Sequence, residues 1–590
     1  MRTPKINYIF RYDVITAFLC SFFALVTLFF TLAPGDGTWI LYGNQLLKGL
    51  SLYGDIKIHQ QPLFPLFGEI ISFFSKNNFL YEKLLFSILP IVFIYTIYKI
   101  SAKLDVSFFK RALFIAGIFF CSIRFEAYRF DDYHIASSFF VMFSIYISIK
   151  YLQKKLSASS YIYIQSFIGS FALFNRINDG FFLFLIVYGI YLYNERNLRN
   201  FILCLLKSLA IATFILSLLL IFSKATYGDW FNLTIAQAGK IKGGTELFLY
   251  PFLILQNSFN FVLTPLLDFK SNLLTPFFIV YILSYLFLRP KLGLSTPFIR
   301  LISISSFILF LYLIHNIYQI SFLNIFLPFA IIISLYGLIL YFWTFFKMKF
   351  LEVHNTNAML CLILYPAFLF TSGSLSSAGS FNDHYFPMAA LIAVTPFIFE
   401  KNKNIFIHER FFFYLLCALL AFDGLVYRIS NPYSWHAYHV PKFFNGYRVS
   451  FNPLHGYFVT NEELSKLIEP VCLKLTKSDT LLSIPFSFAN YYCGVEPWNG
   501  YIQTFFDTSS KSDINDLLIN LKKAPPSYIF YQRQLLNLSM HEKVFNKGMP
   551  LPHRQLDNFL MEKISQNGWL VVYKSQLYSP SEWMLISTKN

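Results

Sequence analysis

The chain has 590 residues, of which 56% are hydrophobic and 13% are charged, and its formal net charge is +17. Soluble domains usually carry about 25% charged residues, so this composition excludes a soluble globular protein and indicates one that crosses a bilayer many times. The lysines and arginines form no run or stripe, which argues against nucleic-acid binding and favours a role in membrane orientation.

Apolar segments of spanning length predict an α-helical polytopic membrane protein with about thirteen transmembrane helices. They lie at 14–33, 80–100, 110–124, 133–151, 160–175, 178–194, 201–222, 273–288, 298–318, 322–346, 357–373, 384–399 and 411–428. With the N-terminus in the cytoplasm, every inward loop is short and basic, as around Lys154, Arg199 and Lys349, whereas the outward loops hold few cations. The predicted inside and outside assignment of the loops is therefore consistent along the whole chain.

An odd number of spans divides the chain into a transmembrane domain, 1–428, and an extracytoplasmic domain, 429–590. Apolar periodicity in the second part predicts helices at 462–475 and 556–566, and strands at 480–484, 527–531, 569–573 and 583–587. This alternation favours a small α/β domain. Cys472 and Cys493 both fall in this part, where an oxidising compartment permits a disulfide, although the sequence does not decide whether it forms.

Two outward loops, 34–79 and 223–272, are too long to be simple connections, and loops of this length are usually functional or disordered. In the first of them, 39–50 and 62–75 carry apolar residues at helical spacing. We therefore expect two helices lying along the outer membrane surface.

Polar residues gather at the outward ends of the spans, where charges close to hydrocarbon are costly. Asp36 stands where the first span emerges, and such a carboxylate could act as a general base or simply cap the following helix. The loop 124–132 is dense in charge. It carries Arg124, Glu126, Arg129, Asp131 and Asp132, followed by His134. These groups serve a site or form a salt-bridge network between helix ends.

Two further clusters complete the outward face. Arg176 lies in the turn between the fifth and sixth spans, where it suits an anionic lipid headgroup or pairs with Asp179. His384, at the entrance of a later span, meets a phosphate or is a structural residue. Together the clusters provide carboxylates for proton abstraction and guanidinium groups for a phosphate, a combination that suits transfer from a lipid-phosphate donor.

Several short motifs carry a resemblance to a known family. They are Asp36, then Leu52-Tyr53-Gly54-Asp55 and Gln60-Gln61-Pro62-Leu63 in the first loop, and Asp383-His384-Tyr385-Phe386-Pro387 before a late span. In these motifs and in its architecture the chain resembles the C-type glycosyltransferase (GT-C) superfamily, in particular its bacterial branch of protein mannosyltransferases and aminoarabinose transferases.

The resemblance implies a multi-pass protein of the bacterial plasma (inner) membrane that moves a sugar, with inversion, from a polyprenyl-phosphate donor to an extracytoplasmic lipid, envelope glycan or protein. It makes Asp36 the general base. It assigns Arg124, Arg129, Arg176 and His384 to the lipid phosphate, and the acidic Asp55, Asp131 and Asp132 to the acceptor side. The chain departs from the family at Gly37, where a second carboxylate often stands, so the sequence gives no support for a divalent metal, and no CxxC or HxxxH spacing suggests one.

Two other functions stay open from the sequence. A transporter or flippase for a lipid-linked saccharide would also need many spans and an outward cavity, but it should carry polar residues along a path through mid-membrane. A membrane acyl- or phosphoryl-transferase could use His134 or His384 as its base.

Overall fold

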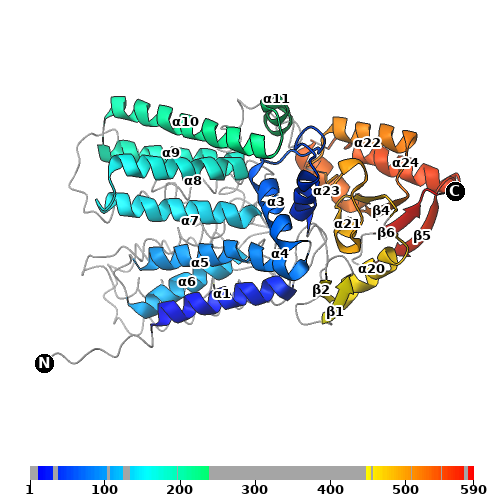
Figure 1. Ribbon diagram of the computed structural model, residues 1–590, viewed down its shortest axis with the longest axis horizontal. Helices are drawn as coiled ribbons and strands as arrows, with labels where there is room; N and C mark the ends of the chain where they lie inside the picture. The colour runs from blue at the N-terminus through cyan, green and yellow to red at the C-terminus, as the bar shows by residue number, and fades with distance from the viewer. Residues whose placement is uncertain are drawn as a thin grey trace, which may run out of the picture. The chain divides into compact units, whose positions relative to one another are not determined.

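The computed structural model is mostly helical, with a small sheet near the C-terminus (Figure 1). It describes residues 11–30, 37–76, 78–102, 107–123, 133–195, 197–237, 421, 447–452, 456–476, 478–506, 508–546, 548–576 and 582–589. The six spans predicted between 273 and 428 lie outside these ranges, apart from residue 421. The chain forms two compact units: the first holds 1–17, 97–122 and 251–426, and the second holds 18–96, 123–250 and 427–590.

Helices occupy each of the first seven predicted spans. They are α1 (Tyr12–Phe30), α4 (Phe79–Phe86) followed by α5 (Ile88–Ser101), α6 (Phe108–Ile123), α7 (Tyr133–Leu152), α8 (Ala158–Asn175), α9 (Ile177–Glu195) and α10 (Leu198–Phe222). Within the described residues, three stretches are long and apolar enough to cross a membrane, namely Phe79–Ser101, Ile135–Leu152 and Leu198–Phe222. The chain is therefore a membrane protein, while the number thirteen stays a prediction.

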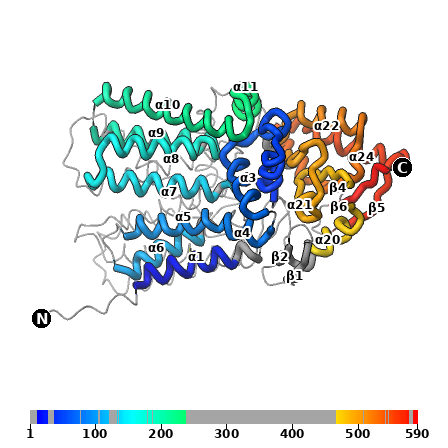
Figure 2. Tube along the Cα trace, viewed as in Figure 1, coloured from blue at the N-terminus to red at the C-terminus, as the bar shows by residue number. Residues whose placement is uncertain are grey.

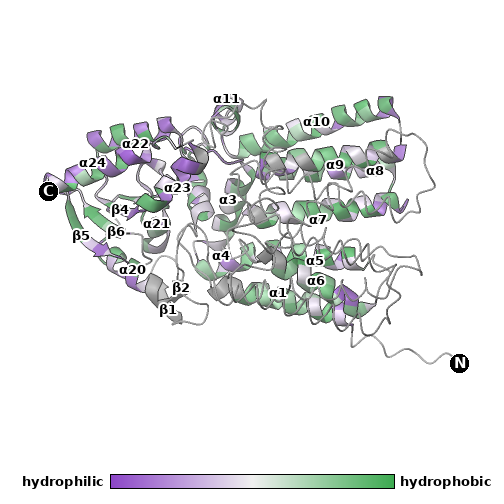
Figure 3. Ribbon diagram, turned by 180° about the vertical axis from the view of Figure 1, so that it is seen from behind, coloured by the Kyte–Doolittle hydropathy of each residue, from purple (hydrophilic) through white to green (hydrophobic). Residues whose placement is uncertain are grey.

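The bundle α7–α10 packs α8 against α7, α9 and α10 (Figures 1 and 2). Its helices are apolar along most of their length (Figure 3), and a few buried polar side chains join them. The amide of Gln165 donates to the carbonyl of Ser144 at 2.9 Å and to the hydroxyl of Ser148 at 3.0 Å. Such hydrogen bonds stabilise helix contacts where water is absent.

In the first unit, a buried carboxylate holds the start of α1. Asp13 is fully buried and lies 3.0 Å from a guanidinium nitrogen of Arg11 and 3.7 Å from one of Arg111 in α6. Two arginines around one carboxylate compensate the cost of its burial, so this group is best understood as structural.

The first loop folds into two short helices, α2 (Thr38–Leu47) and α3 (Leu63–Ser75), which pack closely on each other. They meet at Gly43 and Gly68: a Cβ at either position would overlap the backbone of the other helix. Both predicted helices of the first loop are confirmed, and their location on the membrane surface stays a prediction. Nearly every side chain of α2 is buried, whereas α3 does expose an apolar face with Ile70, Phe73 and Phe74.

The C-terminal region (447–589) begins with a hairpin of β1 (Tyr447–Asn452) and β2 (Gly456–Asn461). It continues with α20 (Glu462–Cys472), β3 (Leu481–Ile484), α21 (Phe488–Cys493), a 3₁₀ turn η6 (Trp498–Gly500), α22 (Lys511–Lys523), β4 (Tyr528–Arg533), α23 (Leu535–Phe545), α24 (His553–Ser565), β5 (Leu570–Ser575) and β6 (Glu582–Ser587). The sheet order is β3-β4-β6-β5, with β3 and β4 parallel and the other pairs antiparallel. All six predicted elements of this region are confirmed to within a few residues.

Both faces of this sheet pack against other elements, because successive side chains of a strand point to opposite faces. One face packs against α22 and α24 with Leu482, Ile529 and Ile586. The other face carries Leu481, Phe530 and Leu585 into a hydrophobic core that also contains α20, α21 and the first-loop helices. The sheet is thus apolar on both sides, and its second face shares a core with residues 39–86.

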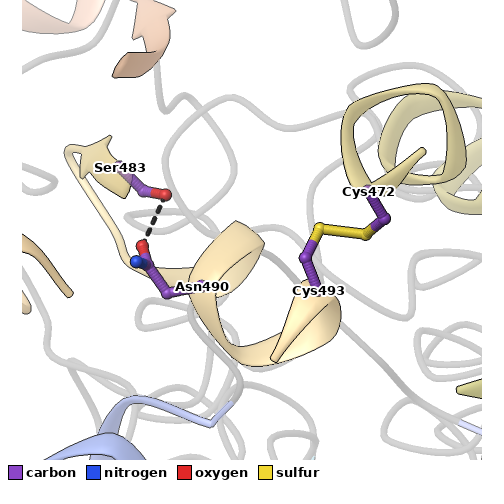
Figure 4. Close-up of a disulfide and its surroundings, with 4 residues drawn as sticks. All are labelled: Cys472, Ser483, Asn490 and Cys493. Atoms are coloured by element: carbon purple, nitrogen blue, oxygen red, sulfur yellow. Dashed lines mark hydrogen bonds between the residues drawn. A yellow bond between two sulfur atoms is a disulfide. The ribbon is translucent and has the colours of Figure 1, made fainter. Parts of the chain in front are cut away.

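A disulfide joins Cys472, at the end of α20, to Cys493, at the end of α21 (Figure 4). The neighbouring Asn490 fixes α21 to strand β3: its amide nitrogen donates to the carbonyl of Leu481 at 2.9 Å, and its amide oxygen accepts from the hydroxyl of Ser483 at 2.7 Å. Helix α21 is therefore held on two sides. The disulfide that the sequence only permitted is present in the structure.

Candidate functional site

Of the site residues predicted from the sequence, the structure describes Asp55 and Arg176. The others lie outside the described residues, so their roles stay predictions. They are Asp36, Arg124, Arg129, Asp131, Asp132 and His384. The candidate site comprises the described residues near Asp55, Arg176 and the start of α2, all of which belong to the second unit.

Arg176 lies at the end of α8, in the turn before α9, and only 12% of its side chain is exposed. A guanidinium nitrogen is 3.6 Å from a carboxylate oxygen of Asp179, which is too long for a hydrogen bond, and the group stands over the ring of Tyr133 at 5.9 Å. A planar guanidinium in such a setting is suited to a phosphate or carboxylate group.

The preceding residue, Asn175, ties the start of α7 to the end of α8. Its amide nitrogen donates to the carbonyl of Tyr133 at 3.0 Å and to the hydroxyl of Ser137 at 2.7 Å. Its amide oxygen is buried and has no hydrogen-bond partner among the described residues. The turn thus combines a cation with an acceptor that a ligand hydroxyl could satisfy.

Tyr133 connects this turn to the first loop. Its ring lies 5.3 Å from the ring of Trp39 in α2 and 6.0 Å from that of Phe64 in α3, both at steep angles. Trp39 and Phe64 are themselves 5.2 Å apart. Edge-to-face aromatic packing of this kind fixes ring positions. The ring of Tyr133 therefore links Arg176 to Trp39, in the helix that begins just after Asp36 in the sequence.

Asp55 lies at the surface in a turn that precedes the Gln60-Gln61-Pro62 motif. Its carboxylate accepts hydrogen bonds of 2.8 Å from both the backbone amide and the hydroxyl of Ser51. The backbone bond first, then the side-chain bond, lower the pKa of Asp55, with help from the charge of Lys57. This carboxylate is a weak base, and its assignment to the acceptor side stays a prediction.

Two residues of the first loop make contacts that sequence reasoning missed. His59 lies between α22 and the segment after α10: its Nε2 is 2.6 Å from a carboxylate oxygen of Asp513, and its Nδ1 is 2.9 Å from the carbonyl oxygen of Leu233. Gln61 accepts a hydrogen bond of 3.2 Å from the indole of Trp230. Trp230 lies in α11 (Tyr227–Phe231), and Leu233 in the π-helix η1 (Asn232–Ala236).

His59 and Ser510 favour the charged form of Asp513. Burial raises the pKa of Asp513, but the hydrogen bond and charge of His59 and the hydrogen bonds from Ser510 outweigh burial and leave the pKa lowered. Asp513 is therefore an ionised acceptor for the hydrogen bonds of these two residues.

A third contact was also missed, at the start of α2. The aromatic ring of Tyr491, in α21, lies against the α-carbon of Gly37, and its hydroxyl donates to the carboxylate of Glu82 in α4. Glu82 is fully buried. The sequence held one signal for this contact, because Glu82 and Lys83 are charges inside an otherwise apolar segment, and such residues usually have a specific partner.

No protein-family model matches the chain, and no curated protein matches it. The candidate site offers a largely buried guanidinium, a buried amide oxygen and aromatic walls at the end of the bundle, beside a first loop fixed by the C-terminal region. These groups suit a ligand that carries both an anion and hydroxyls, at the edge of a membrane-embedded bundle.

Proposed function

We propose that the protein is a membrane glycosyltransferase with a GT-C-like fold of about thirteen spans. It transfers a sugar, with inversion, from a polyprenyl-phosphate donor to an extracytoplasmic acceptor that is a lipid, an envelope glycan or a protein. In this proposal the chain resides in a bacterial inner membrane with its N-terminus in the cytoplasm and its C-terminal region outside.

The observation that carries the proposal is the aromatic link from Arg176 through Tyr133 to α2. Asp36 immediately precedes the first residues of that helix, and Arg176 contacts Tyr133, which packs on Trp39. A base for the acceptor hydroxyl and a cation for the departing lipid phosphate are the two groups that glycosyl transfer needs, because negative charge grows on the phosphate as its bond to the sugar breaks.

These groups account for the proton and for the leaving group of the proposed step. Asp36 takes the proton of the acceptor hydroxyl, whose oxygen attacks the anomeric carbon from the face opposite the phosphate. The bond between the anomeric carbon and the phosphate oxygen breaks, and its electron pair leaves with the polyprenyl phosphate. Arg176, with Arg124, Arg129 and His384, stabilises that charge. Asp55, Asp131 and Asp132 are assigned to the acceptor side.

The test compares Asp36→Asn with wild type, both purified in detergent and assayed for sugar release from a panel of polyprenyl-phosphate donors with envelope lipid extract as acceptor. Asp516→Asn, an exposed carboxylate on α22, is the matched control and should transfer like wild type. Loss of transfer in Asp36→Asn alone supports the proposal. Equal transfer in all three proteins makes Asp36 a helix cap, and no transfer by wild type from any donor favours the transporter, which a vesicle flipping assay then tests.

Arg176→Lys tests the phosphate role separately. Lysine keeps the positive charge near Asp179 but lacks the planar fork that binds two phosphate oxygens. Loss of one charge-assisted hydrogen bond, worth about 1.5 kcal/mol, should lower kcat/KM for the donor about tenfold. Unchanged kinetics would remove Arg176 from the site.

A further inference from the structure

Position 37 has no room for a side chain. Gly37 precedes α2 with φ of 79°, a left-handed conformation that residues with a Cβ rarely adopt. Independently, a Cβ built on Gly37 would overlap the ring of Tyr491. The space that a side chain at position 37 would need is therefore filled by an aromatic ring from a segment more than 400 residues later in the sequence.

Tyr491 is itself held from several sides. It belongs to α21, which the disulfide Cys472–Cys493 joins to α20 and the hydrogen bonds of Asn490 fix to strand β3 (Figure 4). Its ring lies 4.9 Å from that of Phe79, nearly perpendicular to it, and its hydroxyl donates to Glu82. Only 1% of the residue is exposed. A side chain held in one position in this way can hold the backbone that it contacts in one position as well.

We infer that Tyr491 is a positioning residue for the turn at Gly37, and through it for the preceding residue, Asp36. The inference rests on the proposed function, because it gives the C-terminal region a part in the reaction. The C-terminal region supplies the ring that packs against the backbone of Gly37, the residue next to the proposed base. Tyr491 touches neither donor nor acceptor in this proposal. Its effect is on the rate of the chemical step, since a catalytic group displaced by about 1 Å loses as much as about 10²-fold in rate.

The first experiment compares steady-state kinetics of Tyr491→Ala, Tyr491→Phe and Tyr492→Ala. Tyr492 is equally buried in the same helix, and its ring packs against Phe488, Phe79 and Tyr491. The ring that meets position 37 is that of Tyr491, so Tyr492→Ala controls for loss of packing in α21. Tyr491→Ala should lower kcat about 10²-fold with little change in the donor KM. Tyr491→Phe keeps the ring and should retain most of kcat, and Tyr492→Ala should stay near wild type. A kcat for Tyr491→Ala equal to that of Tyr492→Ala would overturn the inference.

A second experiment approaches the contact from the other side. Gly37→Ala should reduce kcat because its methyl group meets the ring. In the double variant with Tyr491→Ala the methyl group no longer meets a ring, so the combined loss should be smaller than the product of the two single losses. If Tyr491→Ala does not fold, Tyr491→Leu, which keeps an apolar side chain but no flat ring, replaces it in both comparisons. Losses that simply add in the double variant would contradict the contact.

The two proposals fail differently. Wild type that transfers sugar, together with an inactive Asp36→Asn and a fully active Tyr491→Ala, upholds the glycosyltransferase and rejects the positioning role. Wild type that transfers no sugar from any donor rejects both, because there is then no base for Tyr491 to position.

Discussion

The bundle α7–α10 and the junction between the first loop and the C-terminal region are built on different principles. The bundle packs helices that follow one another in sequence, with apolar faces and a few polar side chains such as Gln165. The junction joins Gly37 and His59 to Tyr491 and Asp513, residues more than 400 positions away. Local periodicity specifies the first kind of contact, whereas only tertiary packing creates the second. The junction should accordingly be the part where single substitutions matter most.

The largest effect is expected at the disulfide that fixes α21. Cys493→Ser opens a cross-link between residues 21 positions apart, and loss of a loop of this size should lower the free energy of unfolding by ~3 kcal/mol. Thermal unfolding followed by tryptophan fluorescence measures it, with Cys204→Ala in α10 as control, because Cys204 forms no disulfide. Equal midpoints for the two variants would show that α21 is held by its packing alone.

A smaller effect is expected where α2 crosses α3. In Gly68→Ala the new methyl group would overlap the backbone of Trp39, and such overpacking usually costs ~1–3 kcal/mol. The helices must move apart, which shifts Trp39 away from Tyr133. Gly228→Ala is the control, because a Cβ there meets only the hydroxyl of Thr226 at 3.8 Å. A Gly68→Ala protein as stable as this control would contradict the close crossing.

The C-terminal region and the first loop show how far the sequence could predict the structure. Strand 480–484 and helix 462–475 were predictable because alternation and helical periodicity are local signals. The same signal predicted the helix at 39–50 but not its burial, because periodicity marks an apolar face without saying what covers the other one. Here Tyr491 and α3 cover it. His59 gave no signal at all, since its partners Asp513 and Leu233 are near only in the folded chain.

The bundle should respond less to loss of a polar contact. Gln165→Leu removes two hydrogen bonds to α7, yet hydrogen bonds between membrane helices average about 0.6 kcal/mol. We therefore expect a shift in the unfolding midpoint well below that of Cys493→Ser. A loss as large as at the disulfide would show that the bundle depends on a polar network and would weaken the contrast with the junction.

The smallest effect under ordinary conditions is the pH dependence of the junction. The pKa of Asp513 is lowered in the folded protein, as burial is outweighed by His59 and Ser510. A carboxyl with a lowered folded pKa contributes stability above its unfolded pKa of about 3.9 and loses it as the pH falls through the folded value.

From pH 5 to 8, therefore, Asp513 should not make the free energy of unfolding depend on pH. The free energy of unfolding should begin to fall only below about pH 4. Asp513→Asn lacks this titration, so it should be less stable than wild type at neutral pH, and the difference should shrink as acid protonates the wild-type carboxyl. Unfolding midpoints of both proteins between pH 3 and 7 measure it. Parallel curves would mean that Asp513 binds protons equally well in the folded and unfolded chains, and that the ion pair with His59 does not hold the junction together.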